Sequence, residues 1–267
     1  MYWKDEYEFD YCVENEIKFA GKYGAKGEKR QKKRKPTPEQ IKKQNQANRE
    51  KKIRHLLRWN FVKGDYWCTL TFPKGTKMSM DQVLKTVEKF RRNLKNKYKK
   101  MGYEFKWIQR IEIGELGGIH IHIVINRIPD ADVYITEKWK YGKVYFVHIY
   151  EKGGMKKLAS YIVKKPTEEI YEQMSLFSEE EQKHLVKYSC SRNLKRKKPK
   201  RKFYKRRTLK KAIENGPTPR KGFYVDKNSV VFGTNWYTGM SYLRYTEFRI
   251  GYGEDGDDSG ASEHLYI

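Results

Sequence analysis

Cysteine is scarce in this chain, and the three cysteines that it has are far apart. Cys12, Cys68 and Cys190 form no CxxC pair, which argues against a structural zinc site and against a disulfide framework. No stretch approaches the roughly 18 apolar residues of a membrane span, and the start MYWKDEYEFD is too acidic and polar for a signal peptide. A reducing cytoplasm fits these absences. The sequence also lacks a GxxxxGK[ST] phosphate loop, so we expect no ATP-driven motor in this chain.

Acidic residues are few relative to basic ones. The 267 residues include 59 lysines and arginines against 33 aspartates and glutamates, which gives a formal net charge of +26. This excess indicates a polyanionic partner. Aromatic residues make up 15% of the chain, with 21 tyrosines, and they suit base stacking beside so many cations. A coding bias towards lysine and tyrosine produces the same composition, so composition alone leaves both interpretations open.

The chain divides into three parts by composition. Residues 1–60 contain a charged stretch at 22–35, which we expect to be a mobile basic arm, and a long polar helix. Residues 61–185 have the patterns of a folded domain. Residues 186–267 begin with a basic extension, in which 13 of the residues at 192–211 are lysine or arginine. We expect this basic run to be solvated or to lie on phosphate, and a few strands and an acidic, disordered tail to follow it.

The central part predicts a regular alternation of strands and helices. Strands are expected where alternating or β-branched residues occur, and helices where apolar residues recur at helical spacing. The expected elements are a strand at 66–72, a helix at 79–102, two strands around GELGG, a helix at 132–140, a strand at 144–150 and a helix at 155–165. This order predicts an α+β fold with a ferredoxin-like or RRM-like antiparallel sheet, helices packed on one face and the other face open.

Two histidines stand in the strand GIHIHIVI. Side chains two residues apart on a strand share a face, so His120 and His122 point one way while Ile119, Ile121 and Ile123 point into the helix-covered core. Two imidazoles on one open face are a natural half of a metal site. The alternative is a pair of exposed histidines that binds no metal.

A third ligand follows from the hairpin register. A three-residue loop at 115–117 places Gly114 opposite Gly118 and Glu112 opposite His120, on the same face. A two-residue loop would instead turn Glu112 towards the core and make Glu115 the candidate. His148 is a more distant alternative. Two imidazoles and one carboxylate leave coordination positions open for a phosphate oxygen.

A tyrosine and a lysine follow on the next predicted helix. In MKKLASYIVKKP, Leu158 and Ile162 belong to the buried stripe, which leaves Tyr161 and Lys164 together on another face. A tyrosine beside a lysine can act as a nucleophile, because the ammonium disfavours the neutral phenol and offsets charge on a phosphorane. By itself, such a pair is more often a surface coincidence. Its helix, however, follows the histidine strand and can lie across the open sheet face.

Three stretches, CTLTF at 68–72, HIHIVI at 120–125 and YIVK at 161–164, together resemble the ordered motifs of rolling-circle replication initiators. These are the phage and plasmid Rep proteins of the HUH endonuclease superfamily, and the resemblance covers about residues 66–165. It implies that the part 61–185 is an HUH endonuclease domain with a single catalytic tyrosine.

The resemblance also implies a chemistry. His120, His122 and Glu112 would hold Mg²⁺ or Mn²⁺, Tyr161 would attack the scissile phosphate, and Lys164 would stabilise its charge. The expected product is a 5′-phosphotyrosine link with a free 3′-hydroxyl that primes synthesis by a host polymerase.

Several expectations complete this interpretation. The substrate is single-stranded DNA at a replication origin, read by the sheet edge and the N-terminal helix, in the cytoplasm of a bacterial host cell. A host helicase would unwind the duplex, and no membrane is involved. Position 165 is lysine, so a second tyrosine is missing there. The alternatives are a single-tyrosine transposase and a non-catalytic RRM-like protein that binds single-stranded DNA or RNA.

Overall fold

The structure is a computed structural model that describes residues 1–21, 35–73, 75–76, 78–114, 118–150, 154–175, 177–235 and 239–252. The chain forms two compact units. The first unit joins Met1–Asn45 with Arg196–Ser259, and the second contains Gln46–Lys195. Nearly all of the predicted basic arm and nearly all of the acidic tail lie outside the described residues.

The second unit is built on a five-stranded sheet with the order β6-β3-β5-β4-β7, in which all neighbours are antiparallel. Its strands are β3 (Tyr66–Thr71), β4 (Trp107–Ile113), β5 (Ile119–Ile125), β6 (Val144–His148) and β7 (Tyr188–Cys190). Helix α2 (Met80–Lys100) connects β3 to β4, and α3 (Ala131–Lys138) connects β5 to β6. This is the split βαβ arrangement that the sequence predicts, and the α+β class is confirmed. Strand β7 was not predicted.

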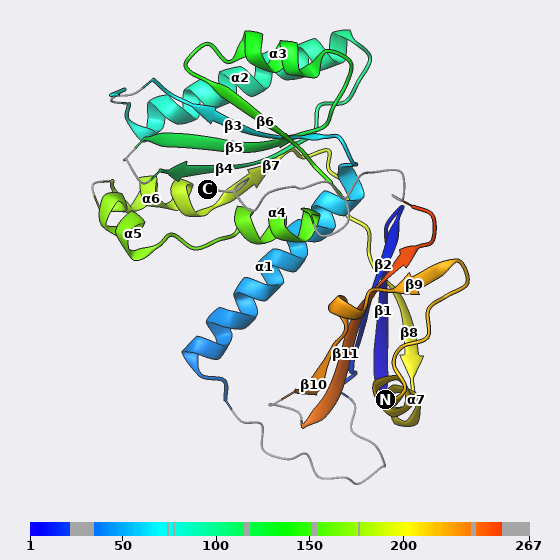
Figure 1. The fold of residues 1–267 in the computed structure, drawn as a ribbon. Coiled ribbons are helices and arrows are strands. Elements are labelled where there is room, and N and C mark those ends of the chain that lie inside the picture. The colour runs from blue at the N-terminus through cyan, green and yellow to red at the C-terminus, as the bar shows by residue number, and fades with distance from the viewer. Residues whose placement is uncertain are drawn as a thin grey trace. The chain divides into compact units, whose positions relative to one another are not determined.

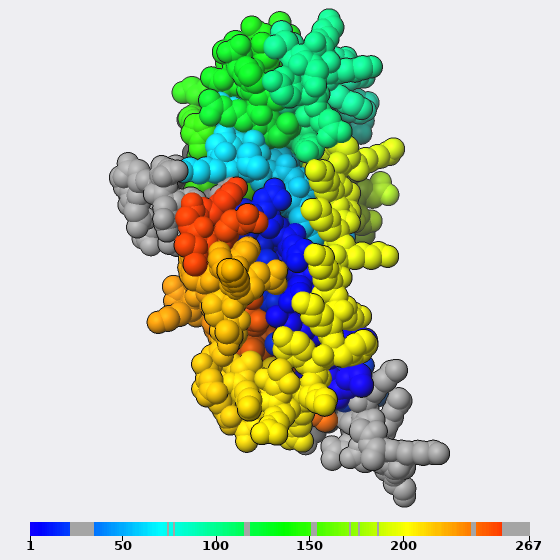
Figure 2. Space-filling model, turned by 90° about the vertical axis from the view of Figure 1, so that its right-hand side faces the viewer, coloured from blue at the N-terminus to red at the C-terminus, as the bar shows by residue number. Residues whose placement is uncertain are grey.

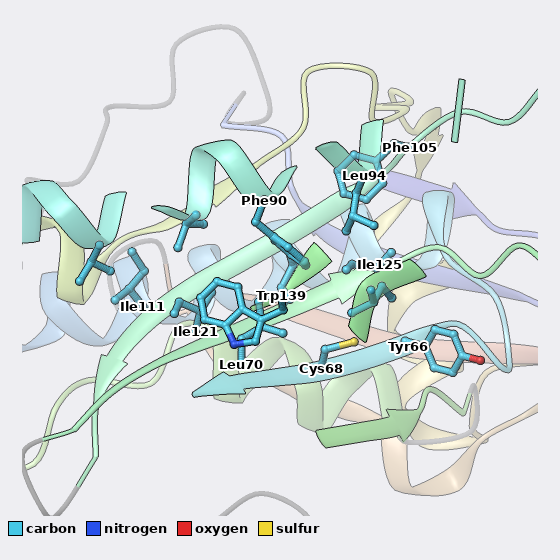
Figure 3. Packing of buried hydrophobic residues seen from close by; sticks show 14 of the residues in the cluster. Tyr66, Cys68, Leu70, Phe90, Leu94, Phe105, Ile111, Ile121, Ile125 and Trp139 are labelled. Atoms are coloured by element: carbon cyan, nitrogen blue, oxygen red, sulfur yellow. The ribbon is translucent and has the colours of Figure 1, made fainter. Parts of the chain in front are cut away.

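Helices α2 and α3 cover one face of this sheet (Figure 1). The alternate residues Ile121, Ile123 and Ile125 of β5 pack against Phe90 of α2 and Trp139 after α3 in one buried cluster (Figure 3). Because β-strand side chains alternate between faces, the same alternation sends His120 and His122 to the opposite face. Helix α2 begins as predicted, with Ser79 and Gln82 forming a reciprocal N-terminal cap.

The remaining helices of the second unit include α4 (Gly154–Ile162), which lies on the other side of the sheet from α2 and α3 (Figure 1). The others are α5 (Glu168–Met174), α6 (Glu179–Val186) and α1 (Pro38–Asn60), whose first residues fall in the first unit. Helix α1 starts with the predicted cap, because the Gln40 backbone N–H donates to Thr37 Oγ1 at 3.3 Å. No helix among the described residues is long and apolar enough to cross a membrane.

The first unit contains a six-stranded antiparallel sheet that combines strands from distant parts of the chain. Its path is β10-β11-β2-β1-β8, and β9 also pairs with β11. The elements are β1 (Tyr2–Glu8), β2 (Cys12–Phe19), β8 (Lys200–Tyr204), α7 (Arg206–Glu214), β9 (Phe223–Val225), the 3₁₀ helix η1 (Lys227–Ser229), β10 (Val231–Asn235) and β11 (Met240–Arg249). Residues 1–60 and 186–267, which differ in composition and are predicted to be separate parts, therefore contribute to one sheet. The N-terminal strands were not predicted.

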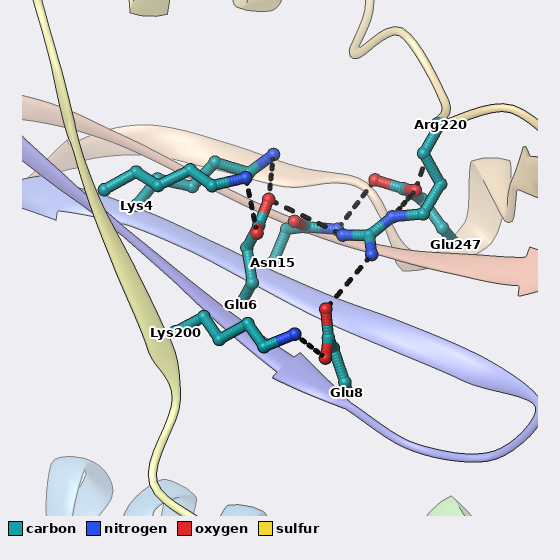
Figure 4. Close-up of polar contacts among 8 residues, drawn as sticks. Lys4, Glu6, Glu8, Asn15, Lys200, Arg220 and Glu247 are labelled. Atoms are coloured by element: carbon teal, nitrogen blue, oxygen red, sulfur yellow. Dashed lines mark hydrogen bonds and ion pairs between the residues drawn. The ribbon is translucent and has the colours of Figure 1, made fainter.

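Opposite charges join β1 to β8. Lys200 Nζ lies 2.6 Å from Glu8, and Lys202 Nζ lies 3.0 Å from Glu6. Arg201 donates two hydrogen bonds to Asp5, at 2.6 and 2.9 Å. Figure 4 shows Lys200 and Glu8 with other members of this network, and Figure 2 shows the yellow segment that contains β8 beside the blue N-terminal strands. Part of the basic run 192–211 is thus used in internal ion pairs, rather than being only solvated or free to lie on phosphate.

Candidate active site

The β4–β5 hairpin has the register that the sequence predicts. Glu112 pairs with His120 and Ile113 with Ile119, and the Gly114 N–H donates to the Gly118 carbonyl at 2.8 Å. Glu112 therefore lies on the open face beside the histidines. The alternative ligand Glu115 lies outside the described residues.

His148 lies on the wrong face to join this group. It pairs with Tyr66 across β6 and β3, and Tyr66 belongs to the core covered by α2 and α3. Side chains of directly paired residues project from the same face. His148 is thus on the opposite face of the sheet from His120 and His122, and it is not a third ligand in this fold.

Tyr161, Glu112 and His122 converge on the open face. The Tyr161 hydroxyl donates to Glu112 Oε2 at 2.8 Å and lies 3.2 Å from His122 Nε2. His122 Nε2 is itself 3.1 Å from Glu112 Oε2. A phenol, a carboxylate and an imidazole thus meet in one small triangle between α4 and the sheet.

A buried arginine that the sequence motifs did not indicate supports this triangle. Arg110 is 3% exposed, and its Nε forms an ion pair of 2.9 Å with Glu112 Oε1. Its Nη1 donates to the backbone carbonyls of Tyr161 and Ile162, at 3.0 and 3.2 Å. The last carbonyls of a helix lack acceptor bonds from within the helix, so Arg110 fixes the end of α4 relative to β4. The available signal was its spacing, because a residue two before Glu112 on a strand shares its face.

Two residues of the CTLTF strand and its approach hold the His122 ring. Trp67 stacks on it with centroids 5.4 Å apart and planes at 12°. Thr69 Oγ1 lies 3.1 Å from His122 Nδ1. When Nδ1 carries the proton, it donates to this hydroxyl, and the lone pair of Nε2 then points towards Glu112 and Tyr161.

His120 stands apart from the triangle. Its ring centroid is 6.4 Å from that of His122, and its ring lies over Gly114, where an added Cβ would be 2.9 Å from His120 Cε1. Burial, then the neighbouring His122, lowers the pKa of the His120 imidazole, against a smaller opposing effect of Glu112. The glycine leaves the space that this ring occupies.

The donor set fits a divalent cation in part. Within the described ranges, no three His, Cys, Asp or Glu side chains form a group that could hold a metal ion. Glu112 Oε2 and His122 Nε2, however, are 3.1 Å apart, and neighbouring ligands of an octahedral Mg²⁺ at about 2.1 Å are separated by about 3 Å. His120 would complete the set only after its ring turns away from Gly114.

Lys164 lies beyond the helix rather than on it. Helix α4 ends at Ile162, and the Lys164 N–H closes a turn onto the Tyr161 carbonyl at 3.0 Å. The predicted helix at 155–165 is therefore too long. Pro166 disfavours a helical conformation for the residue before it. The Lys164 side chain is exposed.

The electrostatics of the triangle keep the phenol protonated in this state. Burial and then the charge and hydrogen bond of Glu112 raise the pKa of Tyr161 far above its usual range, and Arg110 offsets this only slightly. Burial alone would raise the pKa of Glu112, but its contacts with His122, Arg110 and Tyr161 outweigh burial and lower it. The carboxylate is therefore charged and the phenol is neutral.

Residues 65–169 match a family model of replication-associated proteins, the ORF2 type. This stretch holds β3 to α4 and thus every residue of the triangle, although it is less than half of the 267-residue chain. The match supports a replication-associated protein that binds DNA at an origin. Neither the comparison with curated proteins nor that with solved structures gives a significant match.

Proposed function

We propose that this protein is a replication initiator of the HUH endonuclease superfamily, which nicks and rejoins single-stranded DNA at an origin. One observation carries the proposal: the Tyr161 hydroxyl lies within hydrogen-bonding distance of both Glu112 and His122. These residues also lie inside the segment that matches a replication-associated family. A buried phenol placed against an acid and an imidazole on an open sheet face suits nucleophilic attack better than passive binding.

The reaction is a transfer of the phosphoryl group from DNA to tyrosine. Tyr161 Oη forms a bond to the scissile phosphorus, and the bond from that phosphorus to the 3′ oxygen breaks. The phenol proton passes to Glu112 Oε2, which already accepts it in a hydrogen bond, and the leaving 3′ oxygen takes a proton from water. The products are a 5′-phosphotyrosine link and a 3′-hydroxyl that primes synthesis by a host polymerase. The reverse attack by a 3′-hydroxyl rejoins a strand.

A divalent cation completes this chemistry. His120, His122 and Glu112 would hold Mg²⁺ or Mn²⁺, which binds a phosphate oxygen and offsets the charge of Glu112. Thr69 and Trp67 hold the His122 ring in place for this role. The exposed Lys164 follows Tyr161 closely enough for its ammonium to approach the bound phosphate and stabilise the charge that develops there.

The proposal is tested by formation of a covalent adduct. The wild-type protein is incubated with Mn²⁺ and labelled single-stranded oligonucleotides that tile the DNA flanking its coding sequence, with and without EDTA. We expect an adduct that EDTA abolishes and that Tyr161→Phe does not form. Tyr103→Phe is the matched control, because Tyr103 is 47% exposed and follows α2, outside the triangle.

The two ways in which the proposal can fail are distinct. An adduct retained in Tyr161→Phe would overturn Tyr161 as the nucleophile. Binding of the oligonucleotides by the wild-type protein without chelator-sensitive cleavage would instead support the passive RRM-like binder. A host helicase is a further part of the proposal, since duplex DNA must be opened before its strand can reach the open face of the sheet.

A further inference from the structure

Strand β6 forms an edge of the second unit's sheet next to the candidate active site. Val144 and Phe146 pack against the helix-covered core, so Tyr145 between them points to the open face. Tyr145 is 53% exposed. Lys143, two residues earlier, is also exposed, and along extended chain its side chain shares that face.

The register places Tyr145 and Lys143 in line with the site. Tyr145 pairs with Thr69, which pairs with His122. With neighbouring strands about 4.8 Å apart, Tyr145 is about 10 Å from His122 across the sheet.

Lys143 continues the neighbouring row. Thr71 pairs with His120, and the Thr71 N–H donates to the Lys143 carbonyl at 3.0 Å. Each row that begins at a histidine thus ends at an exposed aromatic or cationic side chain on the edge strand.

The start of β6 is fixed firmly to β3. The Lys143 N–H donates to Thr71 Oγ1 at 3.1 Å, and the Trp139 indole N–H donates to the Thr71 carbonyl at 3.0 Å. Gly142 approaches so closely that an added Cβ would be 2.2 Å from the Thr71 carbonyl oxygen. Tyr145 and Lys143 are therefore presented by a rigid element, which lowers the entropy cost of binding through them.

We propose that Lys143 and Tyr145 form a binding track for the single-stranded DNA that flanks the reacting phosphate. This inference rests on the proposed function. Tyr145 stacks on a base, and Lys143 contacts a backbone phosphate. Every base has a π-face and every nucleotide a phosphate, so these contacts hold the strand in position without reading its sequence. Trp67 on the same face cannot serve, because it is 4% exposed and stacked on His122.

The first test separates binding from cleavage by using the full-length Tyr161→Phe protein. Oligonucleotides of the cleaved sequence, each with one 2-aminopurine, are titrated with this variant. We expect quenching at a position next to the scissile phosphate, and loss of that quenching with about tenfold weaker binding when Tyr145→Ala is added. Tyr145→Phe should restore both, because the ring is retained. Tyr103→Ala is the control for loss of an exposed tyrosine.

The second test addresses the lysine. In the same background, Lys143→Ala should lower the slope of log affinity against log salt by about 0.7, the value for one phosphate contact on a single strand. Lys100→Ala, an exposed lysine at the end of α2, should leave the slope unchanged.

The outcomes distinguish the track from the proposed nuclease. A wild-type protein that nicks, together with Tyr145→Ala that binds and nicks equally well, would overturn the track and leave the nuclease intact. Quenching that depends on Tyr145 in a protein that never forms an adduct would support the track and overturn the nuclease.

Discussion

The Tyr161 hydroxyl donates a 2.8 Å hydrogen bond to Oε2 of Glu112. This contact has two effects of opposite sign. It orients the phenol towards the centre of the site, and it raises the pKa of Tyr161 because the carboxylate charge disfavours a phenolate. The described conformation is therefore an oriented but protonated state. Neutralising Glu112 removes the second effect while the backbone of α4 keeps the orientation.

Arg110→Met is expected to destabilise the protein by about 3 kcal/mol, because it leaves the Glu112 carboxylate without its buried cation. The same change removes the side-chain donor to the two carbonyls at the end of α4. Urea unfolding followed by circular dichroism measures the decrease in stability. Adding Glu112→Gln should recover part of it, and Arg92→Met, at an exposed position of α2, should have little effect. Additive costs in the double variant would contradict coupling between Arg110 and Glu112.

Thr69→Val is expected to weaken Mn²⁺ binding by about 10- to 100-fold, the usual cost of removing the hydrogen-bond partner of a metal-binding histidine. The valine keeps the shape of the side chain but removes the oxygen that lies 3.1 Å from His122 Nδ1. Isothermal titration calorimetry measures the affinity, and Thr69→Ser should retain it. Equal affinities for the valine variant and the wild type would mean that Thr69 does not orient the ring.

Acid is expected to unfold the first unit. Burial would raise the pKa of Asp5 and Glu6, but their ion pairs with Arg201, Lys18, Lys4 and Lys202 prevail and lower it. Stability from such groups is present above their unfolded pKa values, about 3.9 and 4.3, and is lost as pH falls through the lower folded values. Resistance to urea should thus weaken steeply below about pH 4. Asp5→Asn should make that dependence shallower, and an unchanged pH profile would remove Asp5 from the explanation.

The cations of β8 and α7 are expected to behave differently. Lys200, Arg201 and Lys202 pair with acids of β1, whereas no ion pair joins Arg206 or Arg207 to an acid in the described part of the chain. Replacing both Arg206 and Arg207 by alanine should lower the salt slope of single-strand binding by about 0.7 for each arginine that neutralises a phosphate. Lys200→Ala should leave the slope unchanged. The opposite result would place the DNA on β8.

Deleting the whole run 192–211 would not test this point. It removes β8 and also Leu209 of α7, which is 1% exposed in the core of the first unit. Weaker binding after that deletion would report unfolding as well as the removal of charge, so point substitutions are required.

The hairpin register could be predicted because one strand carries two messages. The isoleucines of β5 require one face to be buried, and Gly114 and Gly118 limit the turn, so Glu112 has a defined position opposite His120. The ring direction of His120 could not be predicted, because it depends on side-chain torsions and on the space above Gly114. Arg110 was overlooked because a cation in a buried strand has meaning only once its partners are known.

The N-terminal strands were missed for a related reason. In β1, acidic Asp5 and Glu6 occupy buried positions, which contradicts the usual pattern of a strand with one polar face. Their counter-charges come from β8, far along the chain. Local patterns do not reveal a pairing of this kind, because each segment alone reads as a polar extension.

The pairing of Tyr2 with Tyr204 has a consequence for how the protein is made. The first strand to leave the ribosome must wait for one of the last, with its carboxylates hydrated until the matching cations emerge. The polypeptide between them contains a complete sheet and can become compact during that wait, since domains generally fold as units during synthesis. A ribosome that stops before β8 would release a chain that carries Tyr161 but lacks the edge that closes the first unit.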